Sequence, residues 1–276
     1  MWGKMRDIFN RYTVLSVFLL VLFFTIMTTI VGLPTMQGSM DLESGMLTMT
    51  LYQVLLALMC IFLMYKLDVV GSNDFTFKNT GKGLLLGWIL YLLMGISVFT
   101  GYQNRSDFFV TPDPLLLLVV IIFPFSTAFL EETLFRGLIL KILLKNMATT
   151  KKTVYYSFII SALLFGIVHF IHIIWADPLQ VIADLVLATA GGVLLGAIYL
   201  RSKTLIAPIL LHGLFNLAGG IFVAFTNTDY TVPQATFSDV ITMLVVALPL
   251  ILAALILLRK VNPEEISFNN SVVTDQ

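Results

Sequence analysis

Long apolar runs separated by short polar connections set the pattern of this chain. Residues 14–33, for example, contain no Asp, Glu, Lys or Arg. About 20 such residues in helical form cross the hydrocarbon core of a bilayer. We expect about eight spans, near residues 13–33, 46–65, 83–101, 114–140, 154–175, 179–200, 204–225 and 239–258. The fourth contains Pro124, which predicts a kink.

Composition supports the same fold class. Hydrophobic residues make up 58% of the chain and charged residues 12%, and the mean hydropathy is +0.96. A soluble domain carries about 25% charged residues. We therefore predict an all-α, polytopic integral membrane protein. A net charge of zero gives no attraction for nucleic acid. The single cysteine, Cys60, excludes an internal disulfide and a cysteine-rich metal site.

The ends of the spans differ in charge. The N-terminus is basic, and the apolar run after it continues without a small-residue cleavage site, so we expect it to be retained as the first span. With eight spans, every Lys and Arg except Arg105 and Arg136 falls on the side of the N-terminus. Cytoplasmic loops carry such an excess of basic residues. Both termini are therefore expected in the cytoplasm.

A few polar side chains fall inside the apolar runs, where their cost makes a functional role the first hypothesis. Glu132 and Arg136 are four residues apart and can pair on one helix face, while Glu131 points about 100° away. His212 and Asn216 also share a face. At about 1.5 Å per residue, these groups and His169 lie within one or two helical turns of one level. We expect them to form one site.

Other polar or small residues gave weaker signals. His172 is expected at the membrane interface, near Trp175. Nothing in its spacing selects Asp184, although it could face a polar cavity. The glycines at 191, 192 and 196 are typical of a packing face between helices.

Three motifs in order resemble a known family. Glu131-Glu132-x-x-x-Arg136, Phe165-x-x-x-His169 and His212-x-x-x-Asn216 are similar to the motifs of the CPBP (Abi) intramembrane proteases, which are related to the type II CAAX prenyl endopeptidase. The resemblance implies eight helices around a catalytic cavity. We accordingly divide the chain into three N-terminal spans (1–111), a protease core (112–226), a last span (227–260) and a short polar tail (261–276).

The resemblance also implies roles for these residues. Glu131 and His169 would hold and activate water, and His212 and Asn216 would form the oxyanion hole. Glu132 and Arg136 would orient and support the first pair. Hydrolysis needs water, so the cavity must open to solvent, and we expect this opening on the cytoplasmic side.

Metal dependence stays open at this point. Family naming often says metalloprotease, and Glu131, His169 and His212 could make a three-ligand zinc site with an open position. The sequence has no H-E-x-x-H helix, however, and each motif offers one ligand. We favour a mechanism without a metal or other cofactor.

The expected partners are the lipid bilayer and a membrane-associated or lipidated peptide substrate. The simplicity of the chain suggests a bacterial cell membrane, where peptide processing or bacteriocin immunity fits better than CAAX cleavage because bacteria generally lack prenylation. The sequence does not indicate an oligomeric state. Two alternatives are a proton-coupled transporter using the glutamates and histidines as a relay and a non-catalytic scaffold that regulates a membrane partner. The first three spans lack a matching polar set, which disfavours the transporter.

Overall fold

Helices make up most of the described chain, which comprises residues 2–148, 150–226 and 234–261 of a computed structural model. These residues contain no strand, only an isolated bridge between Phe109 and Thr226. The elements are α1 (Trp2–Arg11), α2 (Thr13–Met36), α3 (Leu42–Lys66), α4 (Thr80–Leu86), α5 (Trp88–Arg105), η1 (Ser106–Phe108), α6 (Pro114–Glu132), η2 (Thr133–Ile139), α7 (Leu140–Met147), α8 (Lys151–Val168), η3 (His169–Ile174), α9 (Pro178–Ser202), α10 (Ile206–Gly220), η4 (Ile221–Phe225) and α11 (Phe237–Arg259). The all-α prediction is confirmed. The expected polar tail lies, apart from Val261, outside the described residues.

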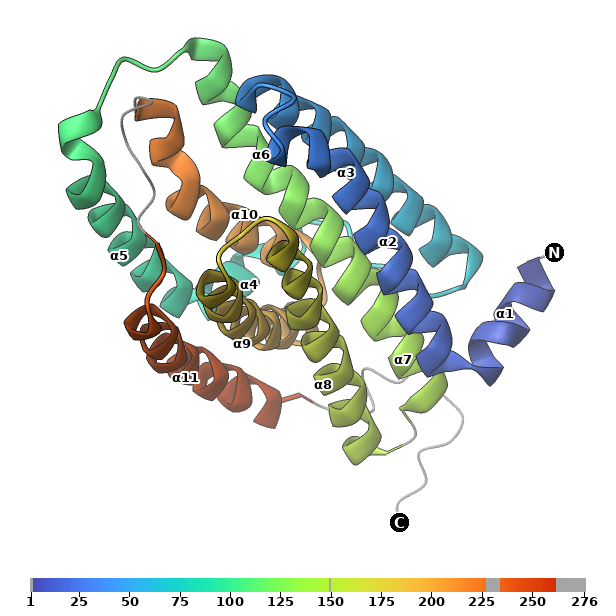
Figure 1. Ribbon diagram of the computed structural model, residues 1–276. Helices are drawn as coiled ribbons and strands as arrows, with labels where there is room; N and C mark the ends of the chain where they lie inside the picture. The colour runs from blue at the N-terminus through green and yellow to red at the C-terminus, as the bar shows by residue number, and fades with distance from the viewer. Residues whose placement is uncertain (1, 149, 227–233, 262–276) are drawn as a thin grey trace.

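Seven helices in the described part of the chain are long and apolar enough to cross a membrane. An eighth span results if α4 and α5, which meet at an angle of 62°, are counted together. The expected number of about eight spans therefore agrees with the structure. Figure 1 shows the bundle, with the α2–α3 turn and the α5–α6 connection toward the upper edge.

The fourth span contains Pro124, where the sequence predicts a kink. Helix α6 continues through this proline to Glu132, because a proline removes only one backbone hydrogen bond of a membrane helix. The departure from α geometry comes later, as a π-helix over Thr133–Ile139 that leads into α7. π-Helical segments occur frequently at functional sites. This one begins directly after the two adjacent glutamates.

The core is built around close helix contacts at small residues. A Cβ atom added at Gly192 or Gly196 of α9 would lie 2.8 Å from the ring of Phe165 or Phe158, respectively. Those two glycines therefore pack against α8 as predicted. A Cβ at Gly191 meets nothing within 4 Å, and this residue lines a cavity instead. The packing prediction is wrong for Gly191, because a rotation of about 100° per residue turns it away from α8.

The same contact geometry predicts the cost of filling one glycine. In Gly166→Ala on α8, the new methyl would lie 1.9 Å from Thr189 Oγ1 and 3.0 Å from its Cβ. Overpacking of this kind costs about 1–3 kcal/mol. Gly191→Ala, also within a helix, is the matched control and should be neutral or stabilising. Thermal unfolding in detergent micelles measures both, and equal stability of the two variants would contradict the packing described here.

Candidate active site

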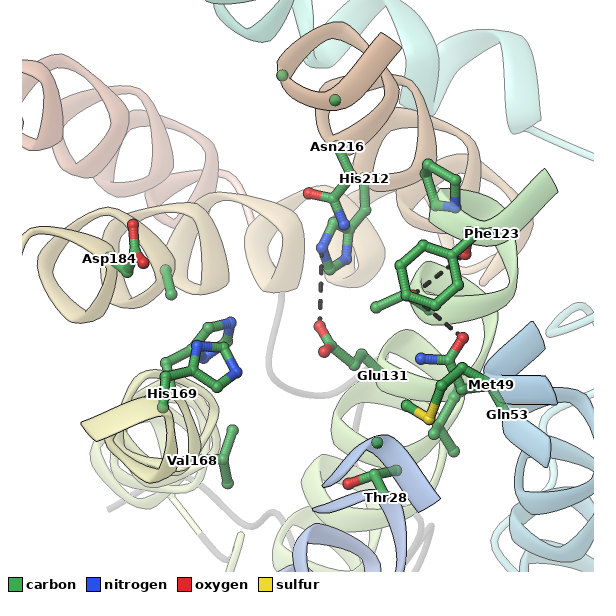
Figure 2. A pocket seen from close by; sticks show the side chains of 18 of the residues that line it. Thr28, Met49, Gln53, Phe123, Glu131, Val168, His169, Asp184, His212 and Asn216 are labelled. Atoms are coloured by element: carbon green, nitrogen blue, oxygen red, sulfur yellow. Dashed lines mark hydrogen bonds and ion pairs between the residues drawn. The ribbon is translucent and has the colours of Figure 1, made fainter. Parts of the chain in front are cut away.

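A cavity of about 770 Å³ lies between α2, α3, α6, α8, α9 and α10. Most of its lining is apolar. Glu131, His169, His212 and Asn216 all line it. Figure 2 shows His169 across the cavity from Glu131, with His212 and Asn216 side by side on a third element. The prediction that three helices bring these groups to one place is confirmed.

Glu131 is the partly exposed carboxylate of this site. Its Oε2 lies 3.7 Å from His212 Nε2, and 24% of its side chain is exposed. The same Oε2 is buried and has no hydrogen-bond partner within the described protein. A buried carboxylate oxygen without a partner carries a large desolvation cost. Glu131 is thus an acceptor directed at the cavity.

Glu132 turns the other way, into the protein. Its Oε1 accepts hydrogen bonds from Arg136 Nη1 at 2.7 Å and from His212 Nδ1 at 2.9 Å. Arg136 also donates from Nη2 to the Gly192 carbonyl at 2.8 Å, and its guanidinium lies 4.4 Å from the centre of the Phe165 ring. Both ends of the ion pair are buried, with 0% and 2% of the side chains exposed. The predicted Glu132–Arg136 pair is confirmed.

The contacts of this pair differ from the expected ones. We predicted that Glu132 and Arg136 support Glu131 and His169, but the Glu132 carboxylate holds His212. Arg136 reaches His169 only indirectly, through its stacking on Phe165. The sequence could not show this contact, because the packing of α10 against the buried side of Glu132 is a tertiary contact.

The two histidines present their other ring nitrogens to the cavity. His169, where α8 gives way to a 3₁₀ helix, has Nδ1 2.9 Å from the Phe165 carbonyl, which can only accept. Its Nδ1 therefore carries the proton, and Nε2 of the neutral ring is an acceptor. His212 Nδ1 likewise donates to Glu132. His212 Nε2 can accept in the neutral ring and can donate as imidazolium.

The cavity lining also includes three polar residues that motif spacing in the sequence did not identify as site residues. His172, expected at the interface, stacks edge-on against His169 with ring centres 5.7 Å apart and lines the cavity. Asp184 lines it as well and accepts from Gln180 Nε2 at 2.7 Å. The 3₁₀ geometry of His169–Ile174 accounts for His172, because three residues per turn place it above His169.

Gln53 is the third residue, and it comes from α3. Its Oε1 accepts from the hydroxyls of Ser126 (2.7 Å) and Thr127 (3.1 Å), which also approach the Phe123 carbonyl. Figure 2 shows the amide nitrogen on the side of Glu131. The sequence feature that could have identified Gln53 is a glutamine inside an apolar run. It predicts a buried partner, but not one on α6.

The residues that the sequence offers as zinc ligands do not gather around one point. Within residues 2–148, 150–226 and 234–261, no three His, Cys, Asp or Glu side chains form a group that could hold a metal ion. Glu131 and His212 approach one another, but His169 lies on the other side of the cavity. The candidate ligands Glu131, His169 and His212 therefore do not fit a three-ligand site in this arrangement.

Comparison with known proteins gives one match. Residues 113–218 match the family described as type II CAAX prenyl endopeptidase Rce1-like. No curated protein and no solved structure matches the chain. The matched segment contains all three motifs, and it begins at the cap of α6 and ends in α10. The chain is accordingly an integral membrane protein in which residues 113–218 are similar to the type II CAAX prenyl endopeptidase Rce1-like family.

Proposed function

We propose that the protein is an intramembrane endopeptidase that hydrolyses peptide bonds of membrane-associated or lipidated peptides. One observation carries the proposal: the Glu131 carboxylate, whose Oε2 has no hydrogen-bond partner within the described protein, lines a largely apolar cavity together with His169, His212 and Asn216. A carboxylate base, imidazole groups and an amide donor around one space are the parts that hydrolysis of an amide bond needs. The family match supports the same reaction class.

The proposed reaction begins with water between Glu131 and His169. Glu131 takes one proton from this water, and His169 Nε2 accepts a hydrogen bond from the other O–H. The water oxygen attacks the scissile carbonyl carbon. The resulting oxyanion accepts hydrogen bonds from the Asn216 amide and from His212 Nε2–H. Because His212 Nδ1 already donates to Glu132, His212 fills this role as imidazolium. Glu131 then returns the proton to the leaving nitrogen as the C–N bond breaks.

The supporting residues act through these groups. Glu132 and Arg136 fix the ring of His212 and neutralise one another within the bundle. Removing one oxyanion donor typically lowers the rate by about 10²–10³-fold. We assign Asn216 and His212 to the oxyanion, and Glu132 and Arg136 to positioning.

The cavity also bears on the substrate. The part of the cavity beside α2 and α3 is lined by threonine and methionine side chains: Thr25, Thr28, Thr29, Thr35, Met46 and Met49. This part can hold an apolar chain next to Glu131. We therefore propose a bacterial cell-membrane enzyme whose substrates carry an apolar or lipid group. Peptide processing or bacteriocin immunity is the proposed biological role.

A reconstituted assay tests this proposal and its independence of metal. The protein in liposomes is mixed with two fluorogenic peptides that are identical except for a farnesyl thioether. We expect hydrolysis, faster for the farnesylated peptide, and an unchanged rate after treatment with 1,10-phenanthroline. A matched sample containing a known zinc protease verifies that the chelator acts. Loss of activity that returns with added zinc would contradict the metal-free mechanism.

A further inference from the structure

The catalytic cavity occupies only one half of the bundle. The face carrying the start of α2 and the end of α11 is here called the termini face, and the face with the α2–α3 turn the far face. The cavity lining runs from Phe24 to Thr35 on α2 and from Leu42 to Gln53 on α3. In both helices this is the half that leads to the far face.

The cavity-lining residues of the other helices also lie toward the far face or in the middle of the bundle. On α10, the lining runs from His212 to Gly220 and continues to Val223 of η4. Helix α9 contributes Asp184–Leu195, and α8 with η3 contributes Phe165–Trp175. Since α8 and α10 run toward the far face and α9 runs away from it, all of these segments belong to the far half or the middle.

The termini half is filled instead. Most of the largest fully buried apolar side chains that do not line the cavity lie there, namely Met64, Leu138, Ile139, Leu140, Leu143, Ile198, Leu205 and Leu211. Together they form an apolar plug between Glu131 and the basic loops. Interiors packed in this way leave no continuous route for water or a peptide.

A buried polar cluster closes the plug at the termini face. Asp74, from the α3–α4 connection, pairs with Lys141 of α7 and accepts from Tyr199 Oη of α9 at 3.1 Å. Backbone groups add to these contacts: Gly71 N–H donates to Oδ2 at 2.7 Å, and Leu205 N–H donates to the Asp74 carbonyl at 2.8 Å. Asp74 thereby ties a loop across the ends of three helices. Breaking such a buried network to admit substrate would leave its charges unpaired, at a high cost.

We propose that peptide substrates and water reach Glu131 from the far half of the molecule, and not from the termini face. The proposal deepens the proposed proteolytic function and rests on it for the identity of the substrate. With basic residues marking the termini face as cytoplasmic, the substrate class is a peptide on the non-cytoplasmic side of the membrane or in that leaflet. This replaces the expectation from sequence that the cavity opens toward the cytoplasm.

Cysteine labelling tests the side of access without any substrate. In a Cys60→Ala background, Met49→Cys and Thr28→Cys place a thiol in the far-half cavity, and Lys82→Cys places one on the exposed termini face. Leu138→Cys, in the plug, is the buried control. A sulfonated, membrane-impermeant maleimide is added to spheroplasts and, separately, to inside-out vesicles.

The expected result is that Met49→Cys and Thr28→Cys react in the preparation where Lys82→Cys does not, and that Leu138→Cys reacts in neither. Because Lys82→Cys reports the termini face directly, the comparison does not depend on how the protein inserts. Reaction of the cavity thiols from the same side as Lys82→Cys, or from neither side, would overturn the proposal. A protein without proteolytic activity would still give the expected pattern, so the two proposals fail separately.

Discussion

Replacing Glu131 by glutamine is expected to lower peptide hydrolysis by about 10²–10⁴-fold, the range contributed by a general base. The amide keeps the size of the side chain but cannot take a proton from water. Because Glu131 is partly exposed and its Oε2 has no hydrogen-bond partner within the described protein, the fold should persist. Hydrolysis of the farnesylated fluorogenic peptide in liposomes measures the rate.

Glu43→Gln is the matched control for this variant. Glu43 lies in the first turn of α3 and does not line the cavity. Its replacement should leave the rate unchanged. A Glu131→Gln protein that folds and hydrolyses the peptide at the wild-type rate would remove Glu131 from the mechanism.

Replacing Arg136 by methionine is expected to destabilise the protein by about 3–5 kcal/mol, as found when one partner of a buried ion pair is removed. The thioether fills part of the space but leaves the Glu132 carboxylate buried, with His212 as its remaining hydrogen-bond donor. It also leaves the Gly192 carbonyl without the guanidinium. Denaturant unfolding in mixed micelles measures the loss.

Two comparisons identify the cause of this loss. Arg259→Met removes an exposed arginine at the end of α11 and should change the free energy of unfolding little. The double variant Glu132→Gln/Arg136→Met removes the uncompensated charge and should be more stable than Arg136→Met alone. If Arg136→Met were no less stable than Arg259→Met, the ion pair would not hold the site together.

The apolar pattern was sufficient to predict the spans because lipid imposes length and composition on every helix that crosses it. It was also sufficient to bring Glu131, His169, His212 and Asn216 together, since rise per residue fixes depth. The π-helix after Glu132 could not be predicted in this way. Its surroundings come from distant parts of the chain, since Met64 of α3 and Leu205, at the N-cap of α10, pack against Gly137 within it.

The partners of individual polar groups were also beyond sequence reasoning. Spacing along one helix pairs Glu132 with Arg136, but it contains no information on which residue of α10 faces them. The same holds for Gln53, whose hydroxyl partners lie on α6. Helix-to-helix distances decide such contacts, and a single apolar pattern leaves the rotation of each helix about its axis undetermined.

The sequence predicted how deep in the membrane the catalytic groups lie, but not the side of the membrane toward which the cavity opens. The polar groups around Glu131 lie near the middle of the bundle, and only the packing of Leu138, Ile139 and their neighbours distinguishes the closed half from the open one. Individual apolar residues look alike in both halves of the sequence. The buried Asp74–Lys141 pair was missed for a related reason, because Asp74 lies in a polar connection between spans.

The central claim is that Glu131 hydrolyses membrane peptides, and a comparison of membrane peptidomes tests it most directly. Cells carrying the wild-type protein and cells carrying Glu131→Gln, at equal protein levels, are analysed by mass spectrometry of membrane-associated peptides. We predict cleavage products that occur only with the wild type, and uncleaved precursors that accumulate with Glu131→Gln. Identical peptidomes in the two strains would contradict the claim.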